Sequence, residues 1–236
     1  MPNKEIAGKM PALPAFRTFI AIELASELRA RIIKHIEHLR RELPDVRASW
    51  NREHNLHLTL KFLGDISITA IPKLSAATER AANTIESFEL IISGCGTFPA
   101  HGQPKVLWIG VHAGSADILS ASSLHPIPDT QHRSISRQPT PVTQHPNSLI
   151  SPLTVLHNAL EDECFRAGFP REARPFHPHL TIARLRSAKG SRRLAQLHKD
   201  LSFEPERFNV SEVVVFRSEL LSEGSKHTAI SRHNLR

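Results

Sequence analysis

Two histidine–threonine pairs are the residues of this sequence whose types and spacing could carry out chemistry. His57 and Thr59 stand in "NLHLTLKFLG", and His179 and Thr181 stand in "HPHLTIARL". Because side chains alternate across a β-strand, each histidine and its threonine should project from one face while the leucine between them packs on the other. The same tetrad in two separate strands favours a shared function over coincidence.

Imidazole and hydroxyl groups in this arrangement suit the transfer of a phosphoryl group. The ordinary pKa of histidine, about 6.5, makes the neutral and the protonated ring available near neutral pH. One ring can accept a proton from the attacking oxygen while the other protonates the leaving oxygen. Threonine hydroxyls can donate to the phosphate oxygens that gain charge. The motifs therefore predict His57 and His179 as catalytic residues, with Thr59 and Thr181 binding the phosphate.

A metal site on the two histidines is the rival chemical interpretation. Neither strand places a carboxylate or a cysteine beside its histidine, and threonine is a poor metal ligand, so we expect no metal and no other cofactor there. Cys95 and Cys164 are far apart and have no C-x-x-C partner. They are therefore expected to be reduced structural thiols rather than part of a disulfide framework or a zinc site.

Two basic residues near the motifs are weaker candidates for substrate binding. Lys61 has the strand parity of His57, so it could contact a phosphate, although a solvated lysine at a strand end is the more ordinary interpretation. Arg184 closes the second motif, but simple alternation puts it on the face opposite His179. A bend in the strand would be needed to bring Arg184 to the substrate.

Composition sets the broad class of the protein. A chain of 236 residues with 40% hydrophobic residues can bury the core of one large domain or of two small lobes. Its net charge of +7 and its pI near 9.9 favour encounter with polyanions such as RNA or nucleotides, without identifying one. No apolar run is long enough to span a membrane and no signal sequence is evident, so a cytoplasmic location is expected.

The elements that must position the motifs alternate between strand and helix periods. Helices are predicted at 26–43, 68–86, 152–169 and 189–199, and strands at 16–24, 55–63, 88–98, 104–113, 174–185, 208–220 and 227–235. Strand pairs interspersed with helices favour an α+β fold with antiparallel sheets. The segment 114–151 is rich in Ser, Pro, His and Gln and has few large apolar residues, which predicts a flexible insertion.

The two H-L-T-hydrophobic elements resemble those of the two-histidine phosphoesterase superfamily, and within it the RNA 2',3'-cyclic phosphodiesterases, also called 2'-5' RNA ligases. "RTFIAIEL", "LWIGV" and "VVVFRSELLSEGSKHTAI" are similar to that family's segments and come in its order. The similarity covers nearly all of the chain from residue 16 onward except the insertion. The sequence departs from the family in the length of 114–151 and at His227, where many relatives have a tyrosine; a change in packing alone is expected there.

The resemblance implies a single bilobal domain over 16–236, with pseudo-twofold symmetry and one His–Thr pair from each lobe in a central cleft. It implies hydrolysis of a terminal 2',3'-cyclic phosphate of RNA to a 2'-phosphate, and some relatives join or cleave 2'-5' linkages in tRNA halves. His57 would protonate the departing 3'-oxygen and His179 would activate water, although the two roles can be exchanged. Arg184 resembles a family position near the phosphate. We expect a monomer that binds RNA or nucleotide cyclic-phosphate ends.

Two alternatives remain open at this stage. The enzyme could act on a small cyclic phosphate, such as that of ADP-ribose, or on 2'-5' oligoadenylate; rates on a dinucleotide and on a long RNA would distinguish these substrates. A non-catalytic RNA-binding module would instead bind phosphorylated RNA and form no product.

Overall fold

The computed structural model describes residues 15–114, 151–222 and 224–236, so that the insertion predicted at 114–151 lies almost wholly outside the described residues. The strands are β1 (Ala15–Glu23), β2 (Ala48–Trp50), β3 (His57–Ser67), β4 (Phe88–Phe98), β5 (Val106–Ala113), β6 (His179–Leu185), β7 (Glu206–Val210), β8 (Glu212–Leu221) and β9 (Gly224–Asn234). The α-helices are α1 (Ser26–Glu42), α2 (Ile71–Ala82), α3 (Pro152–Arg166) and α4 (Ser191–Leu201), with single 3₁₀ turns at Glu53–Asn55 and Ile68–Ala70.

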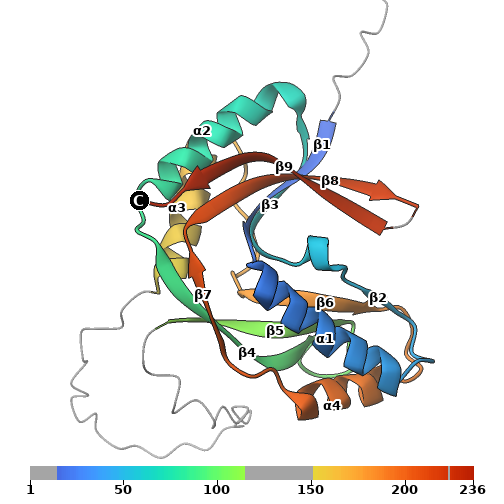
Figure 1. Ribbon diagram of the computed structural model, residues 1–236. Helices are drawn as coiled ribbons and strands as arrows, with labels where there is room; N and C mark the ends of the chain where they lie inside the picture. The colour runs from blue at the N-terminus through green and yellow to red at the C-terminus, as the bar shows by residue number, and fades with distance from the viewer. Residues whose placement is uncertain (1–14, 115–150, 223) are drawn as a thin grey trace, which may run out of the picture.

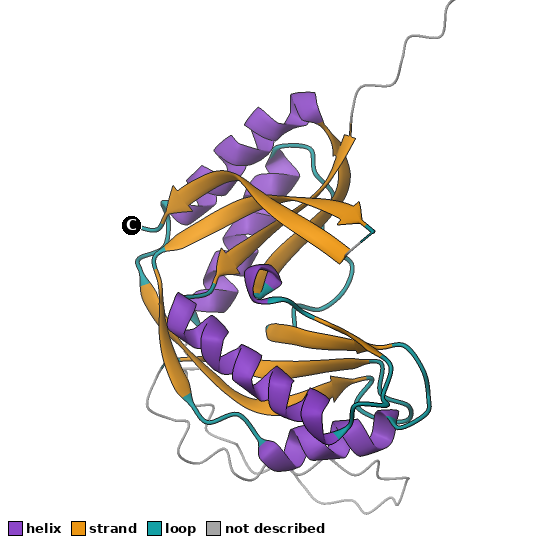
Figure 2. Cartoon of the chain, turned by 45° about the vertical axis from the view of Figure 1, so that its right-hand side comes forward, coloured by secondary structure: helices purple, strands orange, loops and turns teal. Residues whose placement is uncertain are grey.

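The strands form two antiparallel sheets, each with its own pair of helices (Figure 1). One sheet has the order β3-β1-β8-β9 and packs against α2 and α3. The other has the order β2-β6-β5-β4-β7; α4 packs against β4, and α1 lies beside α4. Figure 2 shows the two layers as separate lobes, one above the other. The predicted bilobal α+β fold is confirmed.

Each lobe draws strands from both halves of the sequence. The single strand predicted at 208–220 is in fact two strands, β7 and β8, which separate at Ser211 and belong to different sheets. β8 and the final strand β9 complete the sheet of β1, although nearly the whole chain lies between them and β1. Hydrophobic alternation identifies a strand but not its sheet, because an antiparallel partner can come from any distance along the chain.

The pseudo-twofold relation is visible in the strand order and in a matched irregularity. The series β3-β1-β8-β9 corresponds to β6-β5-β4-β7, with β2 as an additional edge strand. In both motif strands the residue after the threonine, Leu60 in β3 and Ile182 in β6, has no partner on the neighbouring strand. Such a bulge turns the side chains that follow it, up to the next irregularity, onto the opposite face of the sheet.

The bulge in β3 decides the environment of Lys61. This lysine is 1% exposed, and its Nζ donates to Glu161 Oε1 on α3 at 2.6 Å and to the Pro170 carbonyl at 2.9 Å. The expectation that Lys61 shares a face with His57 and could contact phosphate is therefore wrong, because alternation does not continue unchanged through a bulge. Phe62, the next residue, is 60% exposed instead.

The predicted helical faces account for much of the core. Leu28, Ile32, Ile36 and Leu39 of α1 are all buried, and so are Leu153, Leu156, Leu160 and Cys164 of α3. The strand that was expected to end at Gly64 continues to Ser67, because Gly64 adopts a positive φ of 69° and stays paired with Thr18. Among the described helices, none has both the length and the apolar composition needed to cross a membrane.

The buried Lys61–Glu161 pair predicts a large and specific effect on stability. Replacing Lys61 with methionine leaves the Glu161 carboxylate buried without its cation, which should lower the free energy of unfolding by about 3–5 kcal/mol in urea denaturation. The double variant Lys61→Met, Glu161→Met should lose much less than the two single variants added together. Lys199→Met, at an exposed position of α4, is the matched control. Additive losses in the double variant would contradict the pairing.

Candidate active site

The first histidine is held by its own strand entry. His57 is the first residue of β3, and its Nδ1 lies 2.8 Å from the carbonyl oxygen of Asn55. A carbonyl oxygen only accepts hydrogen bonds, so Nδ1 carries the proton and donates it. In the neutral ring Nε2 therefore keeps its lone pair. As alternation predicts, Leu58 is buried, while His57 and Thr59 are partly exposed.

The second histidine repeats this arrangement in the other sheet. His179 is the first residue of β6, and its Nδ1 lies 2.6 Å from the carbonyl oxygen of His177. Leu180 is buried, and Thr181 is partly exposed like its counterpart in β3. Both imidazoles therefore have the same tautomer, fixed by the carbonyl two residues earlier, and both have Nε2 available for a proton transfer.

The two motif strands meet at the boundary between the lobes. β3 and β6 belong to different sheets, yet Cα atoms of the two strands approach within 8 Å of each other. Figure 1 shows both strands near the centre of the molecule, between the helices of the upper and lower lobes. The fold thus brings together two motifs that are separated by more than half of the sequence.

Aromatic rings surround the first histidine. The Phe19 ring stacks on the His57 ring with centroids 4.7 Å apart, and it also stacks on Phe216 at 5.3 Å. Phe62 lies next to Phe19, with their centroids 6.2 Å apart. This apolar environment limits the solvation of a charged imidazole and holds the ring in a single orientation.

Aromatic rings also border the second histidine. The Phe98 ring meets the His179 ring edge to face at 4.9 Å, and the Trp108 ring lies at 6.5 Å. Strand pairing supplies these rings: Phe98 is on β4, and Trp108 pairs with Thr181 across β5 and β6. Sequence patterns do not reveal these contacts, because they depend on which strands become neighbours.

Burial lowers the pKa of both imidazoles. His57 has its pKa lowered to about 4, mainly by burial and further by repulsion from His227. The pKa of His179 is lowered as well, first by burial and then by nearby charges that include Arg184. Hydrogen bonds from the protonated rings to the backbone carbonyls act in the opposite direction but do not offset burial. Both rings are therefore neutral in the free protein at pH 7.

A third imidazole belongs to this site. His227 on β9 meets the His57 ring edge to face at 5.1 Å and the Phe19 ring at 5.0 Å. Its Nδ1 is buried and has no hydrogen-bond partner among the described residues. The sequence predicted only a change in packing at His227, whereas its position also gives it an electrostatic effect on His57. The pairing of β1 with β8, which brings the β8–β9 hairpin and His227 here, could not be deduced from the sequence.

Arg184 lies on the same side of β6 as His179, because the bulge at Ile182 reverses the alternation. The bend that would bring Arg184 to the substrate is therefore present. Arg184 is exposed, and its charge contributes to lowering the pKa of His179. The bulge thus brings a cation to the histidine face of β6, whereas in β3 it turns Lys61 into the core.

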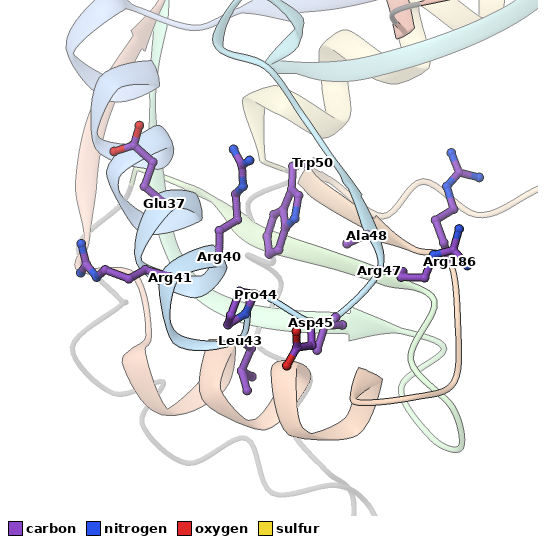
Figure 3. A pocket seen from close by; sticks show the side chains of 11 residues that line it. Glu37, Arg40, Arg41, Leu43, Pro44, Asp45, Arg47, Ala48, Trp50 and Arg186 are labelled. Carbon is purple, nitrogen blue, oxygen red and sulfur yellow. The ribbon is translucent and has the colours of Figure 1, made fainter.

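An arginine-lined pocket of about 730 Å³ lies at the far end of β6 (Figure 3). Arg40 and Arg41 extend from the last turns of α1, and Arg47 and Arg186 lie together on the opposite side. The other residues that line it are Glu37, Leu43, Pro44, Asp45, Val46, Ala48 and Trp50. Four arginines against one glutamate and one aspartate make this surface favourable for an anion.

The pocket connects to the second motif through strand pairing. Arg186 follows β6 directly, and its Nε donates to Ser49 Oγ at 2.7 Å. Ser49 in turn pairs with Arg184 across β2 and β6. His179 and Arg186 are separated by about 23 Å if the strand rises 3.3 Å per residue. A ligand that contacts both must be much longer than one nucleotide.

Neither catalytic candidate belongs to a cluster of metal-ligating side chains in the described part of the chain. The cluster found there, His35, Cys95 and His198, involves other elements. The chemistry that the two motifs offer is thus proton transfer by imidazole, together with hydrogen bonds from hydroxyl groups.

Two known proteins with similar sequences have the same name. The RNA 2',3'-cyclic phosphodiesterase of Methanothermobacter thermautotrophicus is 27% identical over 213 residues, covering 90% of this chain and 95% of that protein. The protein of the same name from Escherichia coli is 27% identical over 221 residues, covering 92% and 94%. These alignments span nearly the full length of the relatives.

Solved structures show the same architecture. The protein TT0787 of Thermus thermophilus has a TM-score of 0.64 and 23% identity, covering 93% of this chain and 98% of that one. E. coli LigT complexed with 3'-AMP has a TM-score of 0.60 and 25% identity, covering 94% and 98%. Because TT0787 is 23% identical to this chain, its similarity shows the fold alone.

The family match includes both motifs. The sequence matches the model of the LigT-like phosphoesterases over residues 22–108 and 145–227, so that one matched segment contains His57 and the other His179. Together the two segments span well over half of the chain. This chain therefore belongs to the LigT-like phosphoesterases, a family of hydrolases.

Proposed function

We propose that this hydrolase opens the terminal 2',3'-cyclic phosphate of RNA to a 2'-phosphate by acid–base catalysis with His57 and His179. The observation that carries the proposal is the matched hydrogen bond from each Nδ1 to the carbonyl two residues earlier, which leaves Nε2 of both rings available for proton transfer. Relatives named RNA 2',3'-cyclic phosphodiesterases support the substrate class.

The reaction needs one neutral and one protonated imidazole. His179 Nε2 accepts a proton from the attacking water as its oxygen bonds to phosphorus, and His57 Nε2 gives its proton to the departing 3'-oxygen. The P–O3' bond breaks, and the phosphate stays on the 2'-oxygen. Because both rings are neutral in the free protein at pH 7, the acid takes up its proton when the anionic phosphate binds beside it.

Three side chains would stabilise the phosphate. Thr59 and Thr181 lie on the histidine faces of their strands and can donate to non-bridging oxygens. Arg184 would add a cation on the His179 side, where the bulge in β6 directs it. Lys61 has no role in substrate binding, because its ammonium group is buried against Glu161.

RNA is favoured over a small cyclic phosphate by the arginine-lined pocket. A mononucleotide at the histidines would not reach it, whereas a longer strand could extend along β6 toward Arg186 and place backbone phosphates beside the arginines. The positive net charge of the chain assists encounter with such a polyanion.

The catalytic assignment predicts the behaviour of histidine variants. His57→Ala and His179→Ala should each lower kcat by about 10²- to 10⁴-fold, because each removes one proton-transfer group. Turnover of an oligonucleotide 2',3'-cyclic phosphate in EDTA, with the 2'-phosphate product identified by chromatography, is the measurement. His101→Ala, at an exposed position, is the matched control and should keep full activity. Turnover by either variant at the wild-type rate would contradict the mechanism.

The lowered pKa values predict an acid-shifted pH profile. The active free enzyme carries one proton, shared between His57 and His179, so kcat/KM should depend on pH as a bell-shaped curve. Both limbs of the curve should lie below pH 6.5, because both pKa values are lowered from that value. Above the upper limb, kcat/KM should fall tenfold per pH unit. The kcat profile should lie at higher pH, because bound phosphate favours the protonated ring.

The acidic limb of this profile can be assigned with His227→Gln. Removing the imidazole that repels protonated His57 raises the pKa of His57, so the limb near pH 4 should move to higher pH in kcat/KM. His233→Gln, on the same strand, is the control and should leave both limbs in place. An unmoved acidic limb in the His227 variant would mean that this limb does not report His57.

The arginine-lined pocket predicts a dependence on substrate length. The double variant Arg47→Ala, Arg186→Ala should raise KM for a cyclic-phosphate oligonucleotide and leave a nucleoside 2',3'-cyclic phosphate unaffected. The slope of log(kcat/KM) against log salt should become shallower by about 0.7 for each phosphate that the variant no longer neutralises. Arg192→Ala, Arg193→Ala, at exposed positions of α4, is the control. Equal effects on both substrates, or none, would favour a small cyclic phosphate instead.

A further inference from the structure

A second cluster of chemically capable side chains lies on the helix-covered side of the five-stranded sheet. It combines His35 of α1, Cys95 of β4 and His198 of α4, and one ligand atom from each lies within 4.8 Å of the others. His35 Nε2 is 2.9 Å from His198 Nδ1, and Cys95 Sγ is 3.9 Å from His35 Nε2. The α1 and α4 helices lie side by side over this sheet (Figure 1).

The buried histidine of the cluster is oriented as a ligand would be. His198 is fully buried, and its Nε2 lies 3.0 Å from the Trp108 carbonyl oxygen. The carbonyl can only accept, so Nε2 carries the proton, and in the neutral ring Nδ1 presents a lone pair toward His35 and Cys95. Metal-binding histidines are commonly fixed in this way, with the second ring nitrogen donating to a backbone carbonyl.

A backbone irregularity directs the cysteine into the cluster. The register of β4 against β5 shifts between Ser93 and Cys95, with Gly94 between them at a φ of 69°. Cys95 is thereby paired with the fully buried Ile109 and packs against the main core. Continued alternation would have placed Cys95 on the other face of the sheet, away from both histidines.

We propose that His35 Nε2, Cys95 Sγ and His198 Nδ1 bind one Zn²⁺ ion. Two imidazole nitrogens and one thiolate suit this borderline-soft ion, and carboxylate-preferring ions such as Mg²⁺ do not match the set. Tetrahedral Zn²⁺ with ordinary bond lengths separates two nitrogens by about 3.3 Å and a nitrogen from a sulfur by about 3.6 Å. The distances from His35 Nε2 to His198 Nδ1 and to Cys95 Sγ differ from these values by a few tenths of an ångström. The distance between Cys95 Sγ and His198 Nδ1 would have to shorten by about one ångström when the ion binds.

Binding of the ion changes the protons of the cluster in a defined way. The proton that His35 Nε2 shares with His198 moves to His35 Nδ1, and the Cys95 thiol releases its proton to solvent as the sulfur–metal bond forms. One proton therefore leaves per ion. A water molecule would fill the fourth position, since three protein groups make up the described ligand set.

The zinc site is separate from the catalytic proposal and has a structural effect. It joins α1, α4 and β4, and through the Trp108 carbonyl it adjoins β5, the strand that pairs with the second motif. The ion should stabilise this lobe without taking part in proton transfer by His57 or His179. Zinc binding and cyclic-phosphate hydrolysis can therefore fail independently.

The experiment uses the full chain, reduced and stripped of metal. Zinc content after reconstitution and dialysis should reach one equivalent, and the unfolding temperature should rise with added Zn²⁺. Substitution with Co²⁺ should produce a thiolate-to-cobalt charge-transfer band in the near ultraviolet. Cys95→Ala should abolish the band and weaken zinc binding by at least about 100-fold. Loss of a side chain that only supports a ligand weakens metal binding by about 10- to 100-fold, so a larger effect indicates a direct ligand. Cys164→Ala, which removes the other cysteine, is the matched control and should retain the band and the affinity for the ion.

Several outcomes would overturn the proposal. They are a wild-type protein without bound zinc, Co²⁺ binding without a thiolate band, or equal affinities in Cys95→Ala and Cys164→Ala. If Cys95→Ala does not fold, the band of Cys164→Ala decides the matter, because Cys95 is the one thiol that this variant keeps. Histidines elsewhere in the chain can bind cobalt but cannot give the band, because they lack a sulfur ligand.

Discussion

The hydrogen bond from each motif histidine to the carbonyl oxygen two residues earlier is the interaction on which the site depends. It lies at the entry of β3 for His57 and at the entry of β6 for His179. Because it fixes the Nδ1–H tautomer, it decides that Nε2 is the atom that can take or give a proton. The Leu58 and Leu180 side chains hold the strands in the core, so that the rings face away from it. The lobes thus repeat a unit of a few residues, and the rest of the fold brings the two units together.

The sequence predicted the histidine, leucine and threonine of each strand correctly, but not the course of the strand after the threonine. Alternation correctly gives the faces of His57, Thr59 and the leucine between them. It fails after the bulge at Leu60, where Lys61 enters the core and binds Glu161 from a distant helix. The matching bulge at Ile182 acts in the other direction, since it brings the Arg184 side chain to the face of β6 that carries His179. Apolar residues follow the threonine in both motifs, and nothing in their type signals an extra residue in the ladder.

Non-local pairing limits the prediction of the site in a second way. The aromatic contacts of His57 come from Phe19 and Phe216, and its electrostatic neighbour is His227. Phe19 reaches His57 through the pairing of β1 with β3, whereas Phe216 and His227 reach it because β8 and β9 join the sheet of β1 after the break at Ser211. Hydrophobic periodicity predicted one strand across that break, since two consecutive strands with the same alternation look like one. Helices and strands, which depend on the local sequence pattern, could therefore be predicted. The sheet to which each strand belongs and the neighbours of each histidine became known only from the structure.

The two half-sites differ in the residues that surround their histidines. After the bulge, the equivalent positions on the histidine face are occupied by Phe62 in β3 and by Arg184 in β6. Two identical half-sites would bind a phosphate ester equally well in either direction, and neither imidazole would be favoured as the acid or as the base. Aromatic rings border both histidines, but only the His179 side has a cation at this position, so the two directions of a bound ester would be unequal. The unequal neighbours also give the two imidazoles different environments, and such a difference gives two side chains of the same type unequal proton affinities.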